Sequence, residues 1–187
     1  MNIPNKLIIL RLVFACCILI LFFFPSRLSG IFILLLYLMG NIADTIDGMI
    51  ARKYEIVTDF GKFFDPLADK ILIVVVVFPL IAHGIIGFWV GALFEIRELL
   101  VLGLRIMCIS KDHVVMADKW GKLKVWSQGI LMILGLIEYI AVSTRPNIEL
   151  VSSKWITVFS FIAVFMSLIS GINYYLKNKS IWSKIKM

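Results

Sequence analysis

The sequence predicts an all-α integral membrane protein with six transmembrane helices. The chain has 187 residues, of which 61% are hydrophobic and only 17% are charged, whereas a soluble domain carries about 25% charged residues. The uncharged runs are long, and a helix needs about 20 mainly apolar residues to cross a bilayer. These runs predict helices near 5–24, 29–51, 65–82, 86–109, 121–143 and 152–176.

The charge-free runs account for the helices in chain order. The first two helices correspond to the runs at 12–26 and 28–43, which Arg27 separates. The run at 71–94 is too long for one helix and contains glycines and a histidine at 83–87, which predicts the end of the third helix, a turn and the start of the fourth. The last two helices cover the runs at 125–137 and 155–176.

The six helices are expected to form one membrane domain, 1–187. A short interfacial segment at about 1–6 precedes them, a basic tail at about 177–187 follows them, and polar links at about 52–64 and 110–120 lie on the same side as both termini. Most lysines and arginines fall on that side, which places the termini in the cytoplasm. The net charge of +7 suits anionic lipid headgroups. Nucleic-acid binding is disfavoured, because no basic soluble domain is present.

Four aspartates interrupt this apolar background. Asp44 and Asp47 are three residues apart near the end of the second helix, and Asp65 and Asp69 are four apart at the start of the third. Both spacings put a pair on one helical face, and a short link joins the helices, so the pairs can meet. Four converging carboxylates repel each other, and ionisable groups at membrane depth are costly without partners. The pattern therefore predicts two Mg²⁺ or Mn²⁺ ions that bind a phosphate ester.

Small residues and an arginine lie between the aspartates. Gly48 and Gly61 remove side chains where a substrate must approach closely, Ala51 is also small, and Arg52 can bind a phosphate as a planar fork. Each charge taken alone could equally be a solvated interfacial residue. The complete spaced set favours a binding site.

A second basic group is predicted around the fourth and fifth helices. Arg97 and Arg105 are eight residues apart, so they lie on similar faces of one helix, and Lys122 follows at the start of the next helix. Arg97 lies well inside an apolar segment and needs a partner. The spacing leaves two alternatives open: an internal carboxylate such as Glu95 or Glu98, or an anionic substrate.

The acidic stretch resembles the signature of the CDP-alcohol phosphotransferase family. The matching positions are Asp44, Asp47, Gly48, Ala51, Arg52, Gly61, Asp65 and Asp69. The resemblance implies six transmembrane helices, a homodimer and a polar active-site cavity that faces the cytoplasm. It also implies a dinuclear Mg²⁺ or Mn²⁺ site on Asp44, Asp47, Asp65 and Asp69, with Asp69 as general base. The residues that would contact the CDP part of the donor are Gly48, Ala51, Arg52, Thr58 and Gly61.

Further segments resemble the members of this family that use sn-glycerol 3-phosphate. They are residues 2–7 with Arg11, the pair Arg97-Glu98, and residues 121–124 followed by Gln128. This resemblance implies transfer of the phosphatidyl group of CDP-diacylglycerol to the 1-hydroxyl of sn-glycerol 3-phosphate in a bacterial plasma membrane, giving phosphatidylglycerol phosphate and CMP. The acceptor phosphate would bind Arg97, Arg105 and Lys122.

Two other functions remain open at the level of sequence. The same chemistry could use an inositol phosphate as acceptor, or phosphatidylglycerol as in a cardiolipin synthase. A cation or proton transporter could also use aspartates within the membrane, but it is expected to have repeated halves and broken helices, and the aspartate motif occurs once in this chain.

Overall fold

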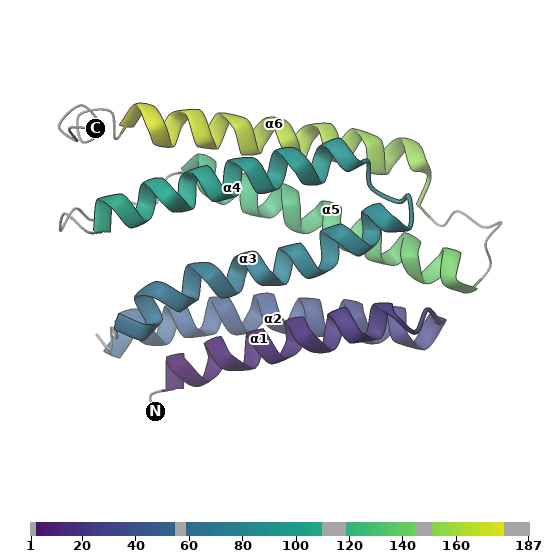
Figure 1. Ribbon diagram of the computed structural model, residues 1–187, viewed down its shortest axis with the longest axis horizontal. Coiled ribbons are helices and arrows are strands. Elements are labelled where there is room, and N and C mark those ends of the chain that lie inside the picture. The colour runs from purple at the N-terminus through teal and green to yellow at the C-terminus, as the bar shows by residue number, and fades with distance from the viewer. Residues whose placement is uncertain (1–2, 55–58, 110–118, 145–150, 178–187) are drawn as a thin grey trace.

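The computed structural model is a bundle of long helices (Figure 1) and describes residues 3–54, 59–109, 119–144 and 151–177. Within these ranges only the backbone is described at residues 3–4, 47, 50–54, 59–60, 62–63 and 105–109. The helices are α1 (Ile3–Phe22), α2 (Arg27–Tyr54), α3 (Asp59–Ala82), α4 (Phe88–Ile109), α5 (Lys119–Thr144) and α6 (Ser153–Lys177).

The observed helices follow the predicted ones closely, with two differences at their starts. Helix α3 begins at Asp59 instead of residue 65, so the second half of the polar link predicted at 52–64 is helical. Residues 3–6, expected as an interfacial lead-in, form the first turn of α1. The prediction placed these boundaries where the hydropathy changes, whereas a helix continues for as long as its backbone N–H and C=O groups pair. At the start of α3, Asp59 also suits the positive end of the helix dipole.

Four of the described helices are long and apolar enough to cross a membrane. Their spans are Asn5–Phe22, Arg27–Ile46, Lys119–Thr144 and Ser153–Lys177. Helices α3 and α4 are of similar length, but each carries at least three charged residues along its apolar stretch. Outward-facing side chains such as Phe23, Phe32, Trp126, Phe161 and Phe165 are more than half exposed. An apolar outer surface of this extent is consistent with a membrane protein.

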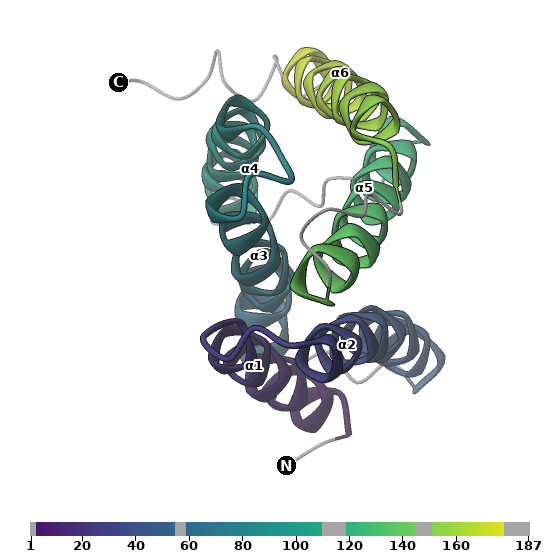
Figure 2. The same ribbon diagram turned by 90° about the vertical axis from the view of Figure 1, so that its right-hand side faces the viewer.

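The helices pack as a base with two arms. Figure 2 shows α1 and α2 at the base, α3 and α4 forming one arm, and α5 and α6 forming the other. Helix α1 packs against α2 and α3, α2 packs against α5, and α4 packs against α6. The core between them is aliphatic and aromatic, with fully buried residues such as Ile18, Ile33, Leu80, Phe94 and Leu131.

One end of the bundle holds the starts of α1, α3 and α5 and the ends of α2, α4 and α6 (Figure 1). We call it the site end. At the opposite end the turn predicted at 83–87 is confirmed, with Gly84 at φ 71°, a conformation that glycine adopts readily. Also at that end, the buried Glu138 of α5 accepts a hydrogen bond from the backbone N–H of Val151 at 2.7 Å. A backbone donor thus satisfies this buried carboxylate.

Candidate functional site

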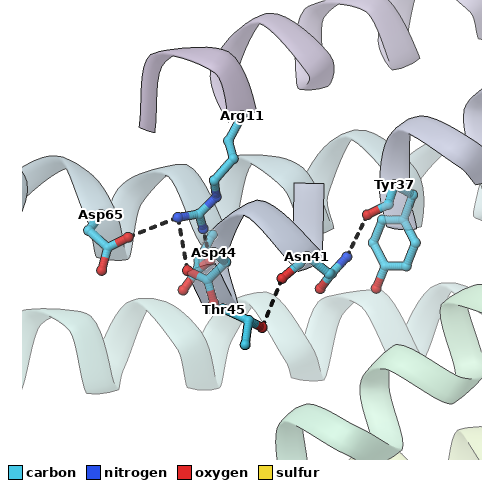
Figure 3. Close-up of polar contacts among 7 residues, drawn as sticks. Arg11, Tyr37, Asn41, Asp44, Thr45 and Asp65 are labelled. Carbon is cyan, nitrogen blue, oxygen red and sulfur yellow. Dashed lines mark hydrogen bonds and ion pairs between the residues drawn. The ribbon is translucent and has the colours of Figure 1, made fainter. Parts of the chain in front are cut away.

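Three carboxylates from two helices meet one guanidinium at the site end (Figure 3). Arg11 of α1 is fully buried; its Nη1 lies 2.8 Å from Asp65 Oδ1 and 2.9 Å from Asp44 Oδ1. Its Nη2 donates to Asp69 Oδ1. The three carboxylate side chains are between 39% and 45% exposed. We call Arg11, Asp44, Asp65 and Asp69 the acidic cluster.

Helix geometry brings these side chains together. Asp65 and Asp69 lie one turn apart on the face of α3 that packs against α1, as their spacing predicts. Arg11 lies on the buried face of α1 with Ile8 and Ala15, which are three and four residues away. A guanidinium offers five N–H donors in a plane, so one arginine can contact carboxylates on both sides.

The side chains of α2 near Asp44 pair within their own helix (Figure 3). Asn41 Nδ2 donates to the carbonyl of Tyr37 at 2.7 Å, and Thr45 Oγ1 donates to the carbonyl of Asn41 at 3.1 Å. Such bonds to the carbonyl four residues back satisfy a polar side chain locally. The Asp44 carboxylate, in contrast, contacts Arg11 of α1.

The donor chemistry of the acidic cluster fits a hard divalent cation. Carboxylate oxygens are the ligands that Mg²⁺ and Mn²⁺ prefer, and three carboxylates already surround one positive group, the Arg11 guanidinium. Among the described residues, no group of three or more carboxylate, histidine or cysteine side chains is arranged to hold a metal ion. The side chain of Asp47, the fourth predicted ligand, lies outside the described residues.

Beside the acidic cluster, three cations meet one carboxylate. Glu98 of α4 is 3% exposed and contacts the ammonium groups of Lys70 from α3 and Lys124 from α5. Arg97 Nη1 lies 3.1 Å from Glu98 Oε1. We call Glu98, Lys70, Arg97 and Lys124 the basic cluster. The cluster joins α3, α4 and α5, so it couples the two arms of the bundle.

The contacts of Arg97 confirm one of the two alternatives left open by the sequence, an internal carboxylate. Besides Glu98, its guanidinium reaches α6: Nε donates to the carbonyl of Ser167 at 3.1 Å and Nη2 donates to Ser170 Oγ at 2.9 Å. The internal partner is thus Glu98 together with α6. A partner of this kind is compatible with binding an anion as well, since a guanidinium can donate in several directions.

The other residues predicted for the acceptor lie differently. Lys122 is exposed at the start of α5, whereas Lys124, two residues later, is buried and contacts Glu98. Residues two apart on a helix point to nearly opposite sides. For Arg105 only the backbone in α4 is described. Of the predicted trio, the structure places Arg97 in the basic cluster.

The residues predicted for the CDP part are described only in part. Gly48 near the end of α2 and Gly61 in the first turn of α3 are partly buried at the site end. Ala51 and Arg52 are helical, without described side chains, and Thr58 lies outside the described residues.

Helix α3 links the two clusters. Asp69 contacts Arg11, and the next residue, Lys70, contacts Glu98. Sequence reasoning did not assign Arg11, Lys70 or Lys124 to the predicted site, and it named Glu98 only as a possible internal partner of Arg97. Their common signal is a charged residue inside or beside an apolar run, which on its own also fits a solvated interfacial charge.

The fold and the clusters together define a class of protein: helical, apolar enough for a bilayer, with ionisable groups gathered at one end, as in enzymes that handle phosphate esters at a membrane. The chain belongs to the CDP-alcohol phosphatidyltransferase family, whose model matches residues 1–182. Members of this family generally use divalent metal ions.

Curated relatives share most of the length of the chain. It is 30% identical over 200 residues to a protein of Bacillus subtilis (strain 168), with 99% of this chain and 97% of the relative covered. It is 33% identical over 174 residues to a protein of Rickettsia typhi, covering 93% and 95%. A Wigglesworthia glossinidia brevipalpis protein is 30% identical over 142 residues, covering 73% and 77%. Each relative is named CDP-diacylglycerol–glycerol-3-phosphate 3-phosphatidyltransferase.

Proposed function

We propose that this protein transfers the phosphatidyl group of CDP-diacylglycerol to the 1-hydroxyl of sn-glycerol 3-phosphate, producing phosphatidylglycerol phosphate and CMP. The near full-length similarity to relatives with that name supports the reaction. The observation that carries the proposal is the neighbouring pair of oppositely charged clusters on α3. One suits cations that bind a pyrophosphate donor, and the other suits an acceptor that itself carries a phosphate.

The donor site in this proposal is the acidic cluster with Asp47. Two divalent cations, Mg²⁺ or Mn²⁺, held by Asp44, Asp47, Asp65 and Asp69 would neutralise the donor pyrophosphate and the charge on departing CMP. Arg52 would bind a phosphate through its planar fork. The glycines and the small residue that would let the CDP part approach are Gly48, Gly61 and Ala51, with Thr58 as a further contact.

The acceptor site in this proposal is the basic cluster. Arg97 would bind the phosphate of glycerol 3-phosphate as a bidentate donor. Arg105, about two turns further along α4, would bind the same phosphate. The lysine from α5 is Lys122 by sequence resemblance, whereas the contact with Glu98 favours Lys124. Because Lys70 adjoins Asp69, a phosphate bound here would place the rest of a small acceptor near the aspartates.

The proton transfer is assigned to Asp69. Its carboxylate would take the proton of the acceptor hydroxyl while that oxygen attacks the β-phosphorus of the donor. The new O–P bond forms as the bond between the β-phosphorus and the bridging oxygen breaks, and CMP leaves with that electron pair. Arg11 contacts Asp69 from the buried side. This contact keeps the carboxylate in position while part of its surface stays exposed.

The topology that accompanies this function is also a proposal. All six helices would cross the plasma membrane as one domain, with the site end and both termini in the cytoplasm and two chains in a homodimer. The start of α1 and the end of α6 at the same end of the bundle support it (Figure 1). Lys6, Lys119, Lys122 and Lys177 also lie at that end, as the excess of positive charge in the cytoplasm requires.

The decisive experiment measures CMP release by the purified protein in detergent with CDP-diacylglycerol and Mg²⁺. We expect release that depends on sn-glycerol 3-phosphate and stops on chelation of the metal. Matched reactions contain an inositol phosphate or phosphatidylglycerol in its place. Release with one of these alone would overturn the acceptor and keep the phosphotransferase chemistry. No release with any acceptor would overturn the proposed reaction.

A further inference from the structure

We infer that α6 positions Arg97 for the acceptor phosphate through a notch formed by the carbonyl of Ser167, the hydroxyl of Ser170 and the bare backbone of Gly171. The inference rests on the proposed function, and it assigns a role to a helix that carries none of the family signature. It makes Ser170 and Gly171 positioning residues for acceptor binding.

The contacts define the notch. Arg97 Nε donates to the Ser167 carbonyl at 3.1 Å, and Nη2 donates to Ser170 Oγ at 2.9 Å. A Cβ at Gly171 would lie 3.3 Å from both Cγ and Nε of Arg97, closer than most such contacts. Ser167 and Ser170 are 1% and 5% exposed, so the notch is inside the bundle. Helix α6 therefore both holds the guanidinium and leaves room for the stem of the side chain.

These contacts matter because a guanidinium recognises phosphate through its plane. Bidentate binding requires the planar fork to face two oxygens at once. An unrestrained arginine would have to lose its rotamer freedom when the phosphate arrives, whereas a side chain fixed in advance has lost it already. Nη1 of Arg97 contacts Glu98 at 3.1 Å, and Nε and Nη2 each donate one hydrogen bond to the α6 notch. Together they set the plane between α4 and α6.

The alternative is that Ser170 only ties α4 to α6 in the apolar core. The hydroxyl of a serine or threonine in a helix can instead donate to a carbonyl of its own helix. Thr157 does this by donating to the Ser153 carbonyl at 2.9 Å. Loss of a purely structural tie would lower stability and reduce all kinetic parameters together. Loss of a positioning contact would act on the acceptor alone.

The test compares Ser170→Ala with Ser160→Ala. Ser160 is also a buried serine of α6, but it lies about 15 Å along the helix from Ser170. We expect Ser170→Ala to raise the KM for glycerol 3-phosphate about tenfold, the typical effect of losing a hydrogen bond to a charged group. The KM for CDP-diacylglycerol should stay within about twofold, and Ser160→Ala should resemble the wild type. Ser170→Thr, which keeps the hydroxyl, should restore most of the acceptor affinity.

Two further variants make the role of Arg97 explicit. Gly171→Ala should raise the acceptor KM with no change at the donor, because the added Cβ displaces the side chain of Arg97. In an Arg97→Ala background, Ser170→Ala should have no additional effect, since the two residues then act as one unit. Additive effects would overturn the inference.

The remaining outcomes separate this inference from the function beneath it. If the wild type releases no CMP with glycerol 3-phosphate, the proposed function has failed. If the wild type is active and Ser170→Ala matches Ser160→Ala, the α6 notch has no positioning role although the function stands. A fall in Tm with equal losses for both substrates would make Ser170 structural, which also overturns the inference.

Discussion

The acidic cluster and the basic cluster are built alike with the charges exchanged. In the first, one buried arginine contacts three carboxylates; in the second, one buried glutamate contacts three cations. They differ in access. The carboxylates are between 39% and 45% exposed, whereas the three basic side chains are between 7% and 23% exposed. We interpret the open acidic cluster as the place for metal ions and a bulky lipid donor, and the enclosed basic cluster as the place for a small anion.

The central residue in each cluster allows the excess charge to exist beside an apolar core. Like charges at this spacing repel, and an unpaired ionised group in a low-dielectric interior is strongly unfavourable. Arg11 and Glu98 offset that repulsion in part and leave each cluster with an excess of one sign. A ligand of opposite charge would neutralise this excess. The excess charge therefore limits the stability of the protein and at the same time provides affinity for the ligand.

The largest effect on activity is expected from Asp69→Asn, which tests whether the reaction takes place at the acidic cluster. The turnover number should fall by about 10²–10⁴, the usual contribution of a general base. The melting temperature should not fall, because the substitution removes one negative charge from a cluster with too many. Both quantities can be measured on the same detergent-purified protein. A loss of activity under about tenfold would exclude Asp69 as the base.

The next effect is expected from Arg97→Ala, which separates the two clusters kinetically. The KM for glycerol 3-phosphate should rise about 10–100-fold, as expected for a lost hydrogen bond to a charged group, while the KM for the CDP donor should change little. Initial rates at varied acceptor and fixed donor, and the reverse, give both constants. Equal effects on both substrates would mean that the clusters do not divide the substrates as proposed.

Much of the fold follows from the sequence because bilayer-length apolar runs leave few alternatives. The six predicted helices are all present as helices, and the turn near Gly84 is where glycine and histidine interrupt an apolar run. The start of α3 was wrong by six residues, since hydropathy marks where a segment can enter lipid and not where its hydrogen-bonded ladder begins. Crossing of the membrane by α3 and α4 stays a prediction.

The part of the site that depends on helical periodicity could be predicted from the sequence. The spacing of four residues correctly placed the carboxylates of Asp65 and Asp69 on one face, and the short link between the helices correctly brought Asp44 to them. The spacing of three residues between Asp44 and Asp47 stays a prediction, because the side chain of Asp47 lies outside the described residues. Arg11 was not predicted as their partner, because a basic residue near the start of an apolar helix equally fits a charge at the cytoplasmic edge. The contact of Ser170 with Arg97 depends on the packing of α4 against α6, which no local pattern records.

A moderate effect is expected from Arg11→Met, which removes the positive centre of the acidic cluster. The three carboxylates would then repel one another, and the melting temperature should fall by the equivalent of about 1–3 kcal/mol, less than for a wholly buried pair because the carboxylates are partly exposed. Mg²⁺ should raise the melting temperature of this variant more than that of the wild type, since it replaces the missing charge. Lys6→Met, at an exposed position of α1, is the matched control. Equal responses to Mg²⁺ would argue against metal binding at these carboxylates.

The smallest effect is expected at Lys122, and it decides which lysine of α5 completes the basic cluster. Resemblance favours Lys122, but that side chain is exposed, whereas Lys124 is buried and contacts Glu98. Lys122→Ala should therefore change the acceptor KM by less than about twofold, as surface substitutions usually do. Lys124→Ala should raise it about tenfold, since it removes a cation facing the bound phosphate. The opposite ranking would show that binding turns this face of α5 toward the substrate, so that the basic cluster without ligand is not the arrangement that holds the acceptor.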